Sequence, residues 1–131
     1  MRDFKELAIW KRSHKLTLEI YLLTRNFPKE ETFGQVSQIR RAVASIPTNI
    51  AEGCGRQTIA EFLNFLNIAS GSASEVEYEL LLAKDLGYMT NEQYMYMYQE
   101  VRSIRSMLSA YMAKLQETKI NQKLESKSKT K

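Results

Sequence analysis

Apolar residues recur at intervals of three and four along most of this chain, which is the spacing of one face of an α-helix. Four such stretches occur, over about residues 4–26, 30–55, 58–87 and 90–118. The longest unbroken pattern lies in the third stretch and comprises Ile59, Phe62, Leu66, Ala69, Ala73, Val76, Leu80 and Ala83. The spacing therefore predicts four amphipathic helices of roughly 25 residues each.

Residues that stop helices stand between these stretches. Pro28 pushes the residue before it out of the helical region and is expected to end the first helix. Gly53 and Gly55 are expected to supply the left-handed backbone positions that commonly close a helix. Gly87 is a natural stop for the third helix.

Two helices begin with the signature of a capping box, in which each of two side chains accepts a hydrogen bond from the other's backbone N–H. Thr58 with Glu61 forms the first box, and Thr90 with Gln93 forms the second. The connections are only a few residues long, so neighbouring helices must run antiparallel. The sequence therefore predicts an all-α fold, an antiparallel up-and-down four-helix bundle.

The periodic pattern ends near Glu117. The segment 119–131 is rich in Lys, Ser, Thr and Gln, and it is too polar to bury enough surface to offset the entropy of ordering it. We therefore expect a bundle domain over residues 1–118, followed by a frayed helix end and a disordered, lysine-rich tail over residues 119–131.

The net charge of +4 is distributed unevenly. Residues 1–56 carry ten Lys and Arg against six Asp and Glu, whereas residues 57–118 carry four against eight. The tail carries five Lys and one Glu. This polarity favours head-to-tail self-association or an anionic partner for the basic half.

The composition is that of an ordinary globular protein, with 44% apolar and 26% charged residues. No run approaches the ~18 consecutive apolar residues of a membrane span, and the first residues lack the apolar stretch of a signal peptide. The single cysteine, Cys54, excludes an internal disulfide and is typical of a reducing compartment. We therefore expect a cytoplasmic protein without a membrane partner.

Residues suited to catalysis or metal binding are scarce. The di-iron sites of four-helix bundles use Glu-x-x-His pairs, but the only histidine, His14, follows Lys11 at that spacing. A lone histidine and a distant Cys54 do not make up a zinc site. No phosphate-binding glycine loop and no Gly-x-Ser-x-Gly motif occurs. We therefore expect neither an enzyme nor a bound metal or cofactor.

Five polar residues fall on one face of the second helix. They are Arg41, Ser45, Asn49, Glu52 and Arg56. One interpretation is a solvated face with weak i,i+4 pairs; the other is a polar network at a subunit interface or ligand groove. Pro47 interrupts the same helix, and Thr48 and Asn49 are expected to satisfy the backbone groups that it frees.

Six small residues follow one another from Ala69 to Ser74 in the third helix. They permit close approach by another helix, and contact or kinking should compensate the helix-weakening effect of Gly71. We assign Gly71 and Ser72 to a subunit interface. Glu75 and Glu79 share a face, so we expect them to pair with Arg40 or Arg41 on a neighbouring helix or subunit.

Three motifs exceed what a helical bundle requires. They are Gln38-x-x-Arg41-Ala42, the run from Ser45 to Gly53 with Arg56, and Gly71-Ser72-x-x-Glu75. These motifs resemble the bacterial four-helix-bundle proteins encoded within 23S ribosomal RNA intervening sequences. The opening Phe4-x-x-Leu7-x-Ile9-Trp10 and the Phe27-Pro28 pair before Glu31 fit the same pattern. The resemblance covers roughly residues 4–116, with Val36 in place of an expected leucine and the tail outside it.

The resemblance implies a pentamer, in which five bundles form a barrel around a central channel. It also implies similarity to the accessory protein of diversity-generating retroelements, a basic barrel that binds nucleic acid and a reverse transcriptase. The family has no established enzymatic activity.

Two functions follow from these observations. The first is a homo-oligomer that binds nucleic acid, most plausibly structured RNA, because several copies multiply weak phosphate contacts. Its expected contacts are Lys11, Arg12, Lys15, Arg40, Arg41 and Arg56. Trp10 among these basic residues is either a core or interface side chain or a platform for a base.

The alternative is a protein-binding adaptor or scaffold for a nucleic-acid enzyme. In the run from Tyr94 to Tyr98, Met95 and Tyr96 cannot face the core together with Met97, so they are left for a second surface. Met and Tyr are favoured at protein interfaces. A carrier of small ligands, the third option, has no dedicated residues.

Overall fold

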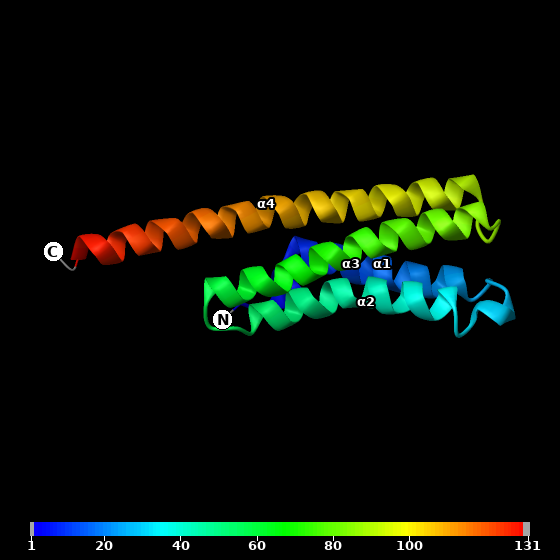
Figure 1. Ribbon diagram of the computed structural model, residues 1–131, viewed down its shortest axis with the longest axis horizontal. Helices are drawn as coiled ribbons and strands as arrows, with labels where there is room; N and C mark the ends of the chain where they lie inside the picture. Colours follow the sequence, from blue (N-terminus) through cyan, green and yellow to red (C-terminus); the bar gives the residue numbers. More distant parts are fainter. Residues whose placement is uncertain (1, 130–131) are drawn as a thin grey trace.

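The structure, a computed structural model, describes residues 2–129, and the regular elements in that range are all helices. Successive long helices run in opposite directions and lie side by side (Figure 1). The predicted all-α, antiparallel four-helix bundle is therefore confirmed. Its elements are the 3₁₀ turns η1 (Phe4–Glu6) and η2 (Lys29–Glu31) and the helices α1 (Ala8–Thr24), α2 (Gln35–Cys54), α3 (Ile59–Asp85) and α4 (Asn91–Lys129).

The apolar stripes of the four helices meet in one core. On α1 the buried face includes Ile9, Ser13, Leu16 and Ile20, whereas Ala8 is exposed. The largest fully buried side chains come from all four helices and are Leu16, Ile20, Ile39, Ile46, Ile50, Leu66, Leu80, Ile104, Leu108, Val43, Val76 and Val101. Burial of such side chains contributes roughly 1.5–3 kcal/mol each and dominates the stability of the bundle.

Two predicted helix starts were wrong by several residues. The first long helix begins at Ala8, because the chain forms a separate 3₁₀ turn over Phe4–Glu6 that Asp3 caps with its side chain. The second begins at Gln35 instead of near Glu30, because Gly34 at its N-cap has non-helical dihedrals.

Both predicted capping pairs are in contact, although only the second has both hydrogen bonds of a capping box. The Thr58 hydroxyl accepts from the backbone N–H of Glu61 at 3.1 Å and donates to its carboxylate at 3.0 Å. In the second box, the backbone N–H groups of Thr90 and Gln93 each donate to the side chain of the other residue. Gly87 ends the α3 region with a φ of 80°, as expected of a residue after a helix.

The predicted left-handed role of Gly53 and Gly55 was wrong. Gly87 alone has a positive φ among residues 2–129, and Gly53 is a buried residue inside α2. A Cβ at Gly53 would lie 2.7 Å from Cδ1 of Phe62 and 3.1 Å from Cβ of Phe65. This glycine is therefore required by the close approach of α3, and its backbone conformation is an ordinary helical one.

Pro47 lies within α2 without ending it. A proline has no N–H, so the carbonyl of Val43 loses its helical partner. The hydroxyl of Thr17 on α1 lies 3.2 Å from this carbonyl oxygen and also donates to Ser13 O at 2.7 Å. The expectation that Thr48 and Asn49 would satisfy the freed group was therefore wrong: a hydroxyl from the neighbouring helix reaches it.

The expected disordered tail is helical where the structure describes it. α4 continues to Lys129, although the last buried side chain is Leu115. The segment contains no Gly or Pro, and Lys, Gln, Glu and Leu all favour helix. Residues 130 and 131 lie outside the described part. Figure 1 shows that this part of α4 projects beyond the end of the bundle near the N-terminus.

None of the helices within residues 2–129 combines the length and the apolar character needed to cross a lipid bilayer.

Candidate nucleic-acid interface

Lys11 and Lys15 lie on the exposed side of α1. They are four residues apart and therefore share one face of the helix. Neither forms an ion pair in the part of the chain that the structure describes. Both ammonium groups are available to an anionic partner.

Arg12, which was predicted to bind nucleic acid together with Lys11 and Lys15, is instead paired with a carboxylate of the bundle. Its Nε and Nη2 atoms donate to Glu100 on α4 at 3.0 and 3.3 Å. The hydrogen bond to Glu100 raises the pKa of the Arg12 guanidinium above its ordinary value. A forked pair of this kind neutralises the cation and links α1 to α4.

Arg56 is also paired. Its guanidinium contacts Glu52 at 3.0 Å and lies over the ring of Phe65, with 4.8 Å between the guanidinium carbon and the ring centroid. Of the six predicted contacts, Arg12 and Arg56 are therefore neutralised within the chain.

The two remaining arginines are held without a carboxylate among the described residues. Arg40 donates to the hydroxyl of Thr24 at 2.9 Å and to the carbonyl of Tyr21 at 3.1 Å, and it lies over the Tyr21 ring. Arg41 donates to the hydroxyl of Ser37 at 3.2 Å. These neutral partners fix the guanidinium groups but leave their charge uncompensated. We call Lys11, Lys15, Arg40 and Arg41 the α1–α2 basic set.

Two aromatic hollows accompany this set, and the sequence had indicated only Trp10 of the first one. In the first, the imidazole of His14 stacks on Trp10 at 4.8 Å with an angle of 9° between the planes, beside a hollow of about 570 Å³ that reaches Pro47. Trp10 is half-buried and His14 is exposed. The i,i+4 spacing of Trp10 and His14 was the available signal.

The second hollow lies at the other end of α1 and α2. It has a volume of about 480 Å³ and is lined in part by Tyr21, Arg40 and Arg41. Phe33 borders it with 97% of its surface exposed. The sequence did not reveal Phe33, because it falls in a stretch that the apolar spacing assigned to the second helix.

Two of the residues assigned to a polar network, Ser45 and Asn49, form one within a single chain. Asn49 donates to the carbonyl and hydroxyl oxygens of Ser45 at 2.8 and 2.9 Å, and Ser72 donates to the Ser45 hydroxyl at 2.9 Å. This network joins α2 to α3. Arg41 and Glu52 lie outside it, since each bonds a side chain four residues away.

The expected pairing of Glu75 or Glu79 with Arg40 or Arg41 is not made within the chain. Arg40 is turned toward α1, and Glu75 is exposed. Burial raises the pKa of the Glu79 carboxyl, and its backbone carbonyl accepts from Gln35 at 2.9 Å.

No neighbouring side chain packs against Gly71. No atom outside its own turn of helix lies within 4 Å of the place a Cβ would occupy. The contact expected at Gly71 is therefore not made within residues 2–129, whereas Ala69 and Ala73 of the same run are buried in the core.

In the run that suggested an adaptor, Met95 and Tyr96 are exposed while Met97 is buried. The Tyr96 hydroxyl donates to Glu19 on α1 at 2.5 Å, and this hydrogen bond raises the pKa of Tyr96 to about 12. Tyr96 therefore serves partly as a link between α4 and α1, while Met95 has no such role.

Among residues 2–129, no group of three or more His, Cys, Asp or Glu side chains is placed to hold a metal ion. Cys54 is buried, and burial raises the pKa of its thiol. This keeps the thiol protonated and unreactive.

Known proteins resemble this chain in sequence and in fold. The family model described as 23S rRNA-intervening sequence protein matches residues 5–110. A solved structure of a protein with unknown function from the S23 ribosomal protein family of Bacteroides thetaiotaomicron VPI-5482 is 31% identical, with a TM-score of 0.73. The match covers 80% of this chain and 98% of that chain. No curated protein matches the chain.

Proposed function

Since the chain belongs to the 23S rRNA-intervening sequence protein family, we propose that it is a non-enzymatic homo-oligomer that binds structured RNA. The single observation that carries this proposal is the α1–α2 basic set, whose four cations have no carboxylate partner among the described residues. Phosphate contacts supply most of the affinity of such surfaces, and they act without a dedicated base-reading motif.

The aromatic hollows support RNA as the ligand. Structured RNA exposes unpaired bases in loops and bulges, which stack on aromatic and imidazole planes. The exposed face of His14, stacked on Trp10, offers such a plane next to Lys11 and Lys15. The cations and the stacking plane therefore lie on neighbouring faces of the first turns of α1.

Self-association is supported by complementary surfaces. α3 carries five acidic side chains and one lysine, and it exposes Tyr78 and Leu81. Within the α1–α2 basic set, Arg40 and Arg41 border the exposed Phe33 and Tyr21, whereas Lys11 and Lys15 lie toward the other end of α1. A basic, apolar face on one copy matches an acidic, apolar face on the next, and such head-to-tail contacts close into rings. The expected ring is a pentamer.

The experiment is RNA binding across a salt series. Each phosphate contact on single-stranded RNA contributes roughly 0.7 to the slope of log affinity against log salt. We expect the Lys11→Gln/Lys15→Gln double variant to weaken binding and to lower this slope by about 1.4. The matched control, Lys29→Gln/Lys84→Gln, removes two charges elsewhere and should bind as the native chain does.

An affinity for structured RNA that does not change with salt, or no binding at micromolar protein, would rule out this function. Equal losses in the two double variants would assign the effect to net charge instead of the α1–α2 basic set.

A second function, a protein-binding adaptor for a nucleic-acid enzyme, is favoured by the exposed Met95. Pull-down after nuclease treatment separates the two functions. Partners that persist, and that Met95→Gln loses, support the adaptor. Loss of all partners with the nucleic acid supports direct RNA binding.

A further inference from the structure

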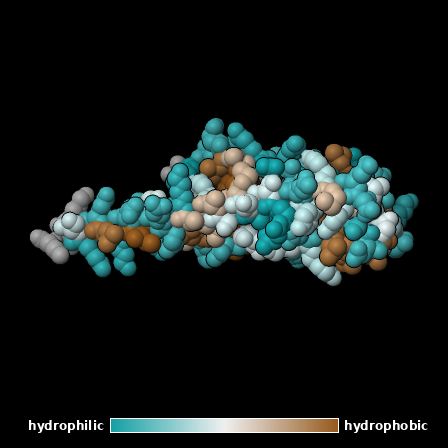
Figure 2. Space-filling view, turned by 90° about the horizontal axis from the view of Figure 1, so that it is seen from above, coloured by the Kyte–Doolittle hydropathy of each residue, from teal (hydrophilic) through white to brown (hydrophobic). Residues whose placement is uncertain are grey.

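The helix α4 extends beyond the end of the bundle. Leu115 is its last buried residue, and the helix continues to Lys129. We call residues 116–129 the α4 extension. It projects past the other helices in Figure 1, and it is coated by hydrophilic side chains in Figure 2 except for a small apolar patch. The family match ends at residue 110, so the extension is a feature of this chain beyond the family pattern.

A polar corner forms where the α4 extension leaves the bundle. It encloses a hollow of about 250 Å³. Its walls come from the N-terminal segment, the α2–α3 connection, the start of α3 and the extension itself. The lining residues are Arg2, Cys54, Arg56, Gln57, Thr58, Ile59, Phe62, Thr118 and Gln122.

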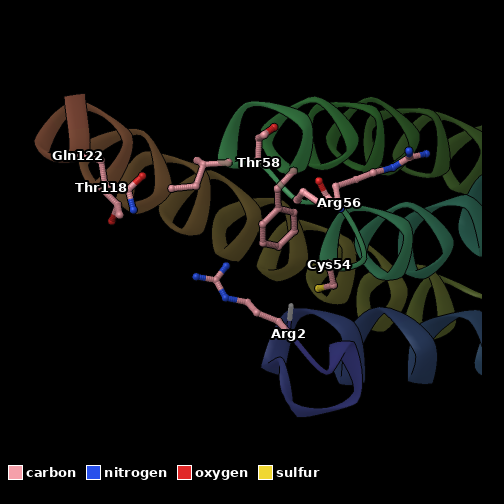
Figure 3. Close-up of a pocket in the computed structure, with 9 residues that line it drawn as sticks. Arg2, Cys54, Arg56, Thr58, Thr118 and Gln122 are labelled. Carbon is pink, nitrogen blue, oxygen red and sulfur yellow. The ribbon is translucent and has the colours of Figure 1, made fainter. Parts of the chain in front are cut away.

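Arg2 is the cation of this corner. Figure 3 shows it reaching from the N-terminal segment into the space beside α4, on the side of Thr118 and Gln122, whereas Arg56 points away along the bundle. The Arg2 guanidinium lies 5.5 Å from the ring centroid of Phe62 and 5.9 Å from that of Tyr111. It forms no ion pair in the part of the chain that the structure describes.

Further cations continue from the corner along the α4 extension. Lys119 and Lys123 are exposed and four residues apart, which places them about 6 Å from each other along the helix axis. The hydroxyl of Thr118 and the amide of Gln122 add neutral donors. The arrangement is a guanidinium beside two aromatic rings, with hydrogen-bond donors next to it and two ammonium groups further along the helix, which suits successive phosphates of one strand.

We propose that this corner and the α4 extension bind the phosphodiester backbone of RNA, as a second contact region apart from the α1–α2 basic set. The inference rests on the RNA binding proposed above. A lipid surface fits less well, because an interfacial helix needs a broad apolar face. The extension exposes only Ile120 and Leu124, at 51% and 59%, as large apolar side chains.

The test uses the full chain and a fluorescein-labelled RNA hairpin with a single-stranded tail. The corner variant is Arg2→Gln/Lys119→Gln, and the control of equal charge is Lys29→Gln/Lys84→Gln. We expect the corner variant to lower the slope of log affinity against log salt by about 1.4, roughly 0.7 for each lost phosphate contact. We expect the control to leave the slope unchanged. Circular dichroism verifies that each variant keeps its helix content.

The outcomes separate this inference from the function on which it depends. If the native chain binds the RNA and Lys11→Gln/Lys15→Gln weakens it while the corner variant does not, the corner proposal is wrong and the proposed function stands. If the native chain binds no RNA, the corner proposal and the proposed function are both wrong. Binding of the native chain to vesicles of anionic phospholipid that the corner variant loses, with RNA affinity unchanged, would also overturn the corner proposal.

Discussion

Two glycines within helices have opposite surroundings, and this difference decides what a methyl group would do at each. The position of a Cβ at Gly53 is occupied by the rings of α3, whereas the same position at Gly71 is open. The helical backbone itself favours alanine over glycine by about 1 kcal/mol at both sites. The effects of an alanine at the two sites should therefore differ because α3 contacts Gly53 and no neighbouring helix contacts Gly71.

We expect Gly53→Ala to lower the free energy of unfolding by about 1–3 kcal/mol, because Phe62 and Phe65 must move. Gly71→Ala should raise it by up to about 1 kcal/mol. Urea unfolding of the two variants beside the native chain measures both effects. Equal shifts of the midpoint would show that α3 does not press on Gly53.

Tyr96 gives a prediction that depends on pH. Its neutral phenol donates to Glu19, so the folded chain holds its pKa at about 12, above the ordinary value for tyrosine. The hydrogen bond therefore contributes its stabilisation fully below about pH 10, and this is lost as pH rises toward 12. Spectrophotometric titration should show a late-ionising tyrosine that Tyr96→Phe removes. The same number of late-ionising tyrosines in both proteins would contradict this.

At the scale of elements, α2 tolerates Pro47 because a neighbouring helix supplies what the proline removes. The orphaned carbonyl of Val43 faces the hydroxyl of Thr17 on α1. An unmet buried carbonyl costs about 1–3 kcal/mol. The position of Thr17 therefore matters to the stability of α2 as well as to α1.

We expect Thr17→Val to lower the free energy of unfolding by about 1–2 kcal/mol in the native background. In a Pro47→Ala background, the backbone N–H of the alanine can donate to the carbonyl of Val43. Thr17→Val should then lower the free energy of unfolding by less than half as much. A double-mutant cycle in urea measures this coupling. Additive effects would show that Thr17 does not serve the Val43 carbonyl.

The elements could be predicted from the sequence because apolar spacing and capping boxes are local signals. Individual side-chain contacts between helices are not local, and several of the predictions about them were wrong. The contact that requires Gly53, the hydroxyl that reaches Val43 O and the carboxylate that takes Arg12 all come from residues distant in the chain. The continuation of α4 was missed because a polar segment without a core was equated with disorder, although its residues favour helix.

The candidate site shows the same limit. Its cations could be identified individually, but spacing along one helix does not reveal which carboxylate lies on the next. Arg12 and Arg40 show this, since one is paired and the other is held by neutral groups. The exposure of Phe33 depends on where α2 begins, a boundary that the apolar pattern placed too early.

At the scale of the whole molecule, the separation of acidic and basic faces leads to a prediction about assembly. Arg41→Glu should weaken self-association, because it puts like charges opposite the acidic face of α3 on the next copy. Glu75→Arg in the same chain should restore it, since every copy in a ring contributes both faces. Light scattering and native mass spectrometry give the stoichiometry. A monomer in the native chain at micromolar concentration would remove the basis of this prediction.

Phe33 provides an independent check on the same assembly. Its side chain is exposed in the single chain, so Phe33→Ser should leave the free energy of unfolding of an isolated copy unchanged within about 0.5 kcal/mol. If Phe33 packs between copies, the substitution should shift the oligomer toward monomer. Unaltered assembly would place the interface elsewhere.

The length of α4 also affects how the protein moves through solution. The fourteen residues from 116 to 129 add a single helical rod of about 21 Å to a bundle whose other helices stop short of it. Such an overhang raises the friction more than the same residues would if they were packed into the bundle. Each copy should therefore sediment and diffuse more slowly than a sphere of 15.2 kDa. Removal of residues 116–129 by trypsin should lower the frictional ratio of the remaining protein.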